Sequence, residues 1–179
     1  MSCYFQEAID GTDEKLQAVL TFKREELLYD IENYAYIEGA VLPRETDPHN
    51  RHMVADAGQD GNVDRISRVL DVEFATMKEM LYPYTKHEIH NAELDNSLRE
   101  PGTYGMILNV PADFSQTTLI LLEKLIHEYL VCKAVADWMS ITNPQKAPVW
   151  EKKAEEAETK LRENLLTRQG RVRRKLGPF

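Results

Sequence analysis

The chain has 179 residues, of which 42% are hydrophobic and 29% are charged, an ordinary composition for a globular protein with its own core. The formal net charge is −8, and two cysteines in unrelated contexts exclude a disulfide framework and a paired-cysteine zinc site. The first residues, MSCYFQEAIDG, lack an apolar run, so we expect no signal peptide and place the protein in a reducing cytoplasm or in an assembly released from it.

The first element predicted from the sequence is a long helix over residues 12–42. Thr12 can serve as its N-cap, and Asp13 and Glu14 then lie in the first turn, where the helix dipole favours negative charge. Pro43 is expected to end this helix. Apolar residues recur along it at three- and four-residue spacing, namely Leu16, Val19, Leu20, Leu27, Ile31, Tyr34 and Val41.

Residues 43–61 are predicted to be a long loop, because they hold two prolines and two glycines and lack an apolar period. A second helix is predicted from Asn62 to about Tyr82. Residues 83–111 are predicted to form an extended, hairpin-like insertion, with one strand near 104–110 and its partner strand between Tyr84 and Ala92. The strand is indicated by the alternation of Tyr104, Met106, Leu108 and Val110 with Gly105, Ile107 and Asn109.

The longest apolar segment runs from Asp113 to Ile141 and is predicted to be the central helix of a bundle. Apolar residues cover more than half of its circumference, which is typical of a helix covered on several sides. Its charged residues exclude a membrane span, because each charge would cost several kcal/mol at mid-membrane. After the break at Asn143–Pro144, a charged helix is predicted from Pro148 to about Thr167. The predicted fold is therefore mainly α, with about four helices bundled in residues 1–167.

Histidine pairs are the first candidates for a metal site, but their spacing does not support one. Each pair is three residues apart, outside a clear helix, and without a companion cysteine or the H-E-x-x-H spacing. We interpret them as loop or interface histidines. The two pairs are His49 with His52 and His87 with His90. The segment from Asp56 to Asn62 resembles a calcium loop only faintly, because Ser67 stands where a bidentate glutamate is required.

The central helix carries polar and aromatic residues that also have structural interpretations. Glu123 and His127 are four residues apart, whereas a di-iron bundle site uses Glu-x-x-His twice, so His127 is interpreted as a polar residue satisfied within the bundle. Cys132 is interpreted as a small buried hydrophobe. Trp138 and Trp150 flank the helix break and are interpreted as holding the two helices together, although they could instead form a patch for a partner. With no catalytic motif in view, we expect no catalytic residues, cofactor or bound metal.

The most distinctive feature of the sequence is the basic tail over residues 168–179. It holds five basic residues and no acidic one, followed by two apolar anchors: Arg168, Arg171, Arg173, Arg174, Lys175, Leu176 and Phe179. Docking on an acidic partner surface is favoured, because the apolar residues follow the basic run. A solvated end and nucleic-acid binding are the alternatives, and the latter lacks interleaved aromatic residues for base stacking.

From Asp113 onward the chain resembles the small helical head–tail connector proteins of tailed bacteriophages. The residues that carry the resemblance are the helix LILLEKLIHEYLVCKAVADWMSI, the Asn143–Pro144 break, and VWEKKAEEAETKLRENLLTR with its basic tail. The resemblance implies a helical bundle that sits in a ring on the portal around the DNA channel, with arms or tails that reach neighbouring subunits.

The predicted function is accordingly that of a structural, non-enzymatic virion protein of the phage neck, assembled in the host cytoplasm. Its predicted partners are the portal protein, other neck or tail proteins and further copies of itself. Genomic DNA would pass without specific binding, and no membrane is involved. The alternative is a cytosolic, nucleic-acid-associated helical protein that serves packaging or replication, which the basic tail would also suit.

Overall fold

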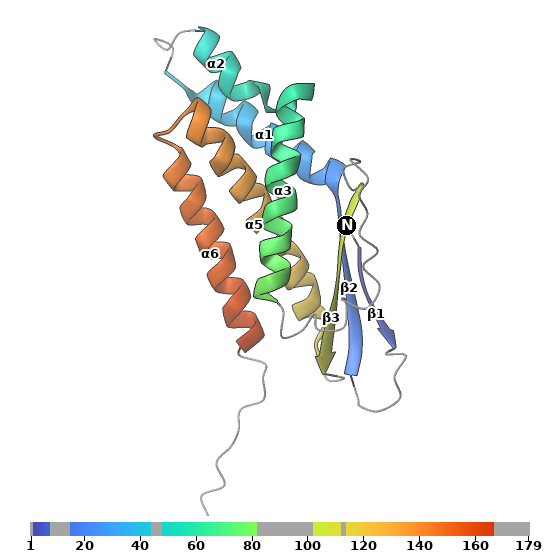
Figure 1. Ribbon diagram of the computed structural model, residues 1–179. Helices are drawn as coiled ribbons and strands as arrows, with labels where there is room; N and C mark the ends of the chain where they lie inside the picture. The colour runs from blue at the N-terminus through green and yellow to red at the C-terminus, as the bar shows by residue number, and fades with distance from the viewer. Residues whose placement is uncertain (1, 8–14, 44–47, 82–101, 112–113, 167–179) are drawn as a thin grey trace, which may run out of the picture.

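The computed structural model describes residues 2–7, 15–43, 48–81, 102–111 and 114–166, and in these residues it contains five α-helices and one three-stranded sheet (Figure 1). The prediction of a mainly α-helical bundle with an extended β element is confirmed. In chain order the elements are β1 (Ser2–Glu7), β2 (Lys15–Lys23), α1 (Arg24–Val41), α2 (Pro48–Ala55), the 3-10 turn η1 (Asp56–Gly58), α3 (Asp60–Met80), β3 (Thr103–Pro111), α5 (Gln116–Thr142) and α6 (Ala147–Leu166).

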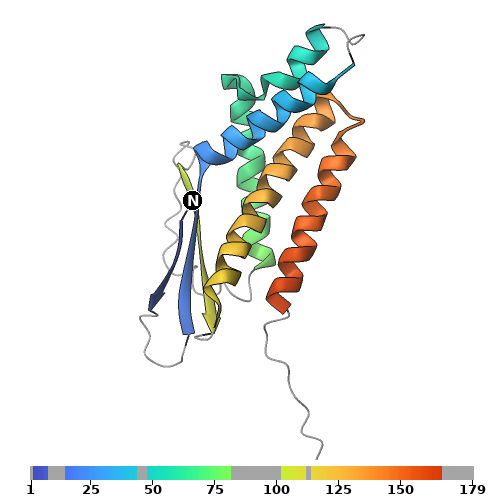
Figure 2. The same ribbon diagram turned by 180° about the vertical axis from the view of Figure 1, so that it is seen from behind.

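Helix α5 is the centre of the bundle, as its wide apolar surface predicts. It buries 15 of its 27 residues, including the unbroken run from Tyr129 to Cys132, so neighbours cover it on several sides. Figure 2 shows α5 between α6 and the sheet, with α1 crossing its upper part. Helices α1, α3 and α6 all contact α5, and their buried residues join those of the sheet in one core cluster.

The first predicted helix is wrong over its N-terminal half, because residues 15–23 form strand β2. β2 is the middle strand of the sheet and pairs antiparallel with β1 on one side and β3 on the other. Ala18, Leu20 and Phe22 are fully buried, whereas Val19 between them is partly exposed, which is the two-residue alternation of a strand. The helix begins only at Arg24, whose backbone N–H donates to the carbonyl of Gly102.

The predicted loop over residues 43–61 is also wrong, because most of it is helical. α2 and η1 occupy residues 48–58, and α3 begins at Asp60. Val54 and Ala57 are buried against α1 and α5, and the Trp138 indole N–H donates to the carbonyl of Val54 at 2.8 Å. These contacts with distant parts of the chain stabilise a short helix that has only a weak apolar pattern of its own.

The predicted strand near residues 104–110 is confirmed as β3, and the partner that the structure describes for it is β2. Leu20 lies opposite Met106 and Phe22 opposite Tyr104 in the antiparallel register. The expected partner segment, residues 84–92, lies outside the described residues. The inner face of the sheet packs on α3: Phe74 lies between Phe22 (ring centroids 6.3 Å apart) and Tyr104 (5.1 Å).

Helices α1 and α2 pack closely at Gly39, where an added Cβ would lie 3.0 Å from the carbonyl oxygen of Arg51 and 3.2 Å from the Cβ of Ala55. We predict that Gly39→Leu lowers the free energy of unfolding by about 1–3 kcal/mol, since the larger side chain forces the helices apart. Gly61→Leu is the matched control, because a Cβ there meets nothing within 4 Å. Urea unfolding of both variants measures the difference, and equal stabilities would contradict the close packing.

Candidate interaction surface

The residues predicted to bind a partner, Arg168 to Phe179, lie outside the described residues, as do His87 and His90. His49 and His52 lie on α2 and are exposed. Among the described residues, no group of three or more histidine, cysteine, aspartate or glutamate side chains is arranged to hold a metal ion. In the same part of the chain, no helix is both long enough and apolar enough to cross a membrane.

Trp138 and Trp150 do not form an exposed aromatic patch, since both are buried. Their hydrogen bonds also differ from the predicted contact across the turn. Trp138 donates to α2, and the Trp150 indole N–H donates to the Glu38 carboxylate of α1 at 3.2 Å. The Trp150 ring also lies 4.9 Å from that of Tyr34, centroid to centroid. The two tryptophans therefore fix α5 and α6 to α2 and α1.

His127 is satisfied within the bundle, as predicted, through one of its ring nitrogens. Its Nε2 lies 2.7 Å from Oδ2 of Asp30 on α1, and its Nδ1 is buried without a hydrogen-bond partner. Glu123, one turn before it on α5, is also buried. The pair of Asp30 and His127 ties the middle of α5 to the first half of α1 and leaves part of the Asp30 carboxylate exposed.

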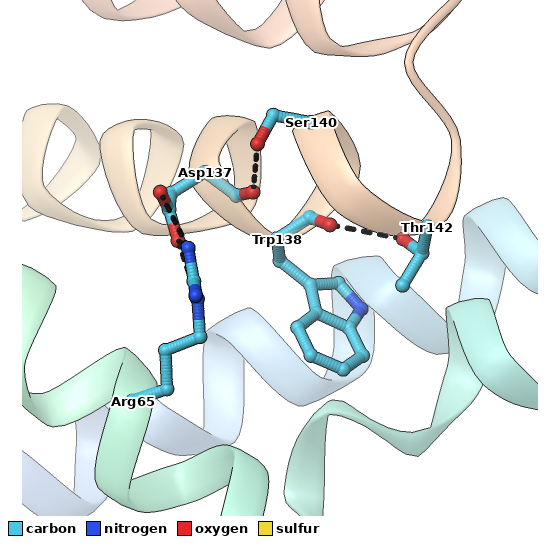
Figure 3. A network of polar contacts seen from close by, with 5 residues as sticks. All are labelled: Arg65, Asp137, Trp138, Ser140 and Thr142. Atoms are coloured by element: carbon cyan, nitrogen blue, oxygen red, sulfur yellow. Dashed lines mark hydrogen bonds and ion pairs between the residues drawn. The ribbon is translucent and has the colours of Figure 1, made fainter.

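Two adjoining hollows of about 560 and 550 Å³ follow α3 where it meets α5 and α6. Most of their charged side chains are paired with one another, and Glu73 accepts from the Tyr129 hydroxyl at 2.8 Å. Arg65 contacts both carboxylate oxygens of Asp137, at 3.1 and 3.3 Å (Figure 3). Lys133 donates to Glu151 at 2.5 Å. These pairs join α3 to α5 and α5 to α6, so this groove is best explained as a seam between helices.

Figure 3 also shows how the end of α5 is held beside this seam. The Ser140 hydroxyl donates to the backbone carbonyl of Asp137 at 2.7 Å, and the Thr142 hydroxyl donates to that of Trp138 at 3.0 Å. Both hydroxyls therefore add a side-chain hydrogen bond to a carbonyl of the preceding helical turn. Asp137 and Trp138 themselves contact α3 and α2 through their side chains.

Among the described elements, α1 exposes the largest number of large apolar side chains, on its outer face. Four large apolar side chains on this helix are exposed: Tyr29 (68%), Tyr36 (64%), Ile37 (48%) and Val41 (69%). Tyr29, Tyr36 and Ile37 recur at the seven- and eight-residue spacing of one helix face. Val41 belongs to the apolar period predicted for this helix and yet is exposed, whereas Tyr29 and Tyr36 were not part of that period. Their spacing was the available signal, but it does not say which face of the helix is covered.

The N-terminal end of this same face is acidic. Glu25, Glu26, Tyr29 and Asp30 line a hollow of about 320 Å³ on α1. Across its 18 residues, α1 carries five acidic side chains and one basic one. We call the surface of α1 that runs from Glu25 to Val41 the α1 outer face. It combines a negative end with an exposed aromatic and aliphatic stripe.

Cys132 is a buried free thiol, as predicted. Burial and the neighbouring Glu128 carboxylate, 3.6 Å from the sulfur, raise the pKa of this thiol from 9.0 to about 12. Because the thiolate is the reactive form, we predict that Cys132 in the native protein alkylates at least about 10³-fold more slowly at pH 8 than in urea. Mass spectrometry of the peptide that contains Cys132 measures both rates. Equal rates in the two conditions would show that the Cys132 thiol is readily exposed to solvent in the native protein.

The same pKa shift predicts a loss of stability in alkali. The neutral thiol is the form that the fold stabilises, so its contribution is complete below pH 9 and is lost as the pH rises toward about 12. Burial and the Glu73 carboxylate raise the pKa of Tyr129 as well, and they add to the effect at higher pH. We expect the free energy of unfolding to fall by up to about 1.4 kcal/mol per pH unit for each group. Urea unfolding of the protein and of Cys132→Ala between pH 9 and 11 measures the slope, which is expected to be shallower in the variant.

Comparison of the chain with known protein families, with curated protein sequences and with solved structures gave no match.

Proposed function

We propose that the protein is a structural virion protein that forms a ring in the neck of a tailed bacteriophage, between the portal and the tail. The observation that best supports this function is the α1 outer face. Ten large apolar side chains are exposed in the described residues, and four of them, two tyrosines, an isoleucine and a valine, lie on this one helix. Exposed apolar surface of this kind marks contacts with other proteins. The resemblance of residues 113–179 to head–tail connectors is the reason for proposing the phage neck as the assembly to which the protein belongs.

The charge distribution fits passage of DNA through such a ring. The chain carries a formal net charge of −8. Like charges repel, so an acidic subunit would not hold DNA that moves through the channel. The basic residues 168–179 are the exception, and in this proposal they contact protein.

Crosslinking mass spectrometry of the native assembly, or of a lysate from infected cells, tests the proposal. We expect crosslinks between copies of this chain and from this chain to portal- or tail-like proteins. Crosslinks to replication or packaging proteins alone would overturn the proposal and favour the nucleic-acid-associated alternative.

The basic tail gives that alternative its own test. Binding of the full chain to duplex DNA is measured at several salt concentrations and compared with Arg171→Gln/Arg173→Gln/Arg174→Gln. A steep salt dependence that disappears in the variant would support a nucleic-acid function. A ring subunit is expected to bind DNA weakly, and with a similar weak salt dependence in both proteins.

A further inference from the structure

We infer that the α1 outer face is the docking site for residues 168–179 of a second copy of this chain. This inference rests on the proposed ring function and names the contact between its subunits. Three observations support it: the charge of α1 compared with the other helices, the order of acidic and apolar residues along the face, and the place where α6 ends.

Charge singles out α1 among the long helices. It carries five acidic residues and one basic residue, whereas α6 carries five acidic and four basic residues. The difference lies in net charge, −4 for α1 and −1 for α6, because both helices also form ion pairs: Glu158 with Arg162 at 2.6 Å on α6, and Glu26 with Lys23 at 3.2 Å at the start of α1. A segment with five basic residues and no acidic one is therefore attracted most strongly to α1.

The order of residues along the face matches the order along the tail. The acidic hollow around Glu25 and Asp30 lies at the N-terminal end of α1, and the exposed Tyr36, Ile37 and Val41 follow toward its C-terminal end. In the tail, the basic residues come first and Leu176 and Phe179 follow. An extended tail that runs in the same direction as α1 places its guanidinium groups near the carboxylates and its apolar end on the apolar stripe. Exposed Tyr29 lies between them and offers a ring on which arginine can stack.

The geometry of α6 favours the tail of a second copy over the chain's own tail. α6 meets α1 near its start, where Trp150 contacts Tyr34, and it then runs away from α1 to end at the opposite end of the bundle (Figures 1 and 2). Leu166 lies 16 residues beyond Trp150, which corresponds to about 24 Å of helix. About seven extended residues would be needed to return over that distance. The chain's own tail would thus use most of its basic residues in crossing, and they could not lie on the acidic end of α1.

A photocrosslinking experiment on the full chain tests the inference. Phe179 is replaced by p-benzoylphenylalanine, and isotopically light and heavy chains are mixed so that links within one chain and between two chains differ in mass. We expect links between two chains that map to residues 36–41 of α1. Links confined to one chain, links to another part of a second copy, or the absence of links between chains in concentrated protein would each overturn the inference.

Charge-swap variants make the test specific. Glu25→Lys/Glu26→Lys and, separately, Arg171→Glu/Arg173→Glu/Arg174→Glu are each expected to lower the yield of the interchain link at least about 10-fold, and their combination in one chain is expected to restore it. Tyr29→Ala/Tyr36→Ala alters only exposed side chains and is expected to lower the yield without unfolding the protein. Glu155→Lys/Glu156→Lys, on the exposed side of α6, is the matched control and is expected to change little. An unchanged yield in the α1 variants would overturn the inference.

Failure of this docking site can be told apart from failure of the ring function. If the native assembly yields links between copies and to portal-like proteins, but not between the tail and α1, the ring proposal stands and the docking site is wrong. If the native assembly yields no links between copies, both are wrong.

Discussion

Replacing Trp138 with alanine is expected to lower the free energy of unfolding by about 3–5 kcal/mol, the usual cost of removing a buried tryptophan. The indole ring is 5% exposed and lies where α5 meets α2. Its removal leaves a cavity in the core and also removes the only donor that the structure gives, within the described residues, to the carbonyl of Val54 from another helix. We therefore expect α2 to detach from α5 before the rest of the bundle unfolds. Urea unfolding, together with hydrogen exchange of residues 48–58, measures both effects.

Trp138→Phe separates packing from hydrogen bonding at this position. Phenylalanine keeps much of the buried ring but cannot donate to Val54, so the expected loss is about 1–3 kcal/mol, the cost of an unsatisfied buried acceptor. Ile141→Ala, close by on the exposed side of α5, is a control that should alter stability by less than about 0.5 kcal/mol. If Trp138→Ala were no less stable than this control, the placement of α2 against α5 would be wrong.

Replacing Phe22 with alanine is the second change with a large expected effect, again about 3–5 kcal/mol. Phe22 is fully buried on the middle strand of the sheet, opposite Tyr104 in the register and against Phe74 of α3. Since the three rings join the sheet to the bundle, removing the Phe22 ring should weaken the packing of the sheet on α3. We expect the pairing of β2 with both of its neighbouring strands to become less stable as a result. Chemical denaturation measures the stability, and hydrogen exchange of β2 and β3 reports where protection is lost.

The contact with α3 can be isolated by a second substitution. Phe22→Leu keeps most of the buried volume, so the change in packing is expected to lower the free energy of unfolding by less than about 1.5 kcal/mol. Loss of the edge-to-face contact with Phe74 adds to this cost. Tyr104→Phe removes only the hydroxyl that donates to Asp71 at 2.7 Å and is expected to cost about 1 kcal/mol. A Phe22→Ala protein that retained full stability would argue against β2 as a central strand and in favour of the helix that the sequence suggested there.

Helix α1 contacts the bundle on one side and exposes its outer face on the other. The helix is held from within by the Asp30–His127 pair and by Glu38, which accepts from Trp150 and lies 3.3 Å from the Lys146 ammonium. Its outer face is left open.

Several elements of the fold have a residue pattern with only one structural explanation, and these could be predicted without the structure. The central helix was predictable because apolar residues surround it over 27 positions, and only a helix in the middle of a bundle buries such a surface. α3 and α6 were predictable from a one-sided apolar period and from proline at or near their ends. The strand at 103–111 was predictable from its strict alternation. The burial of Cys132 followed from its place on the central helix.

The remaining elements depend on contacts between distant parts of the chain. In residues 15–23, Leu16, Val19 and Leu20 fit the spacing of a helix, while Ala18, Leu20 and Phe22 fit that of a strand, so the local pattern alone cannot choose. The pairing of β2 with a strand on each side decides the matter, because both edges of its backbone then form hydrogen bonds. α2 likewise depends on the carbonyl of Val54, which accepts a hydrogen bond from the indole N–H of Trp138, 84 residues away in the chain.

The two sides of the proposed contact differ in the same way, since one was predictable from the sequence and the other was not. The basic tail was visible in the sequence, since five basic residues without an acidic one need no fold to be recognised. The α1 outer face was not, because Tyr29 and Tyr36 could equally have pointed into the core. Only the packing of Leu27, Ile31 and Ala35 against the bundle turned the tyrosines outward. A helix period fixes which residues share a face, but the neighbours that cover one face determine which residues remain for a partner.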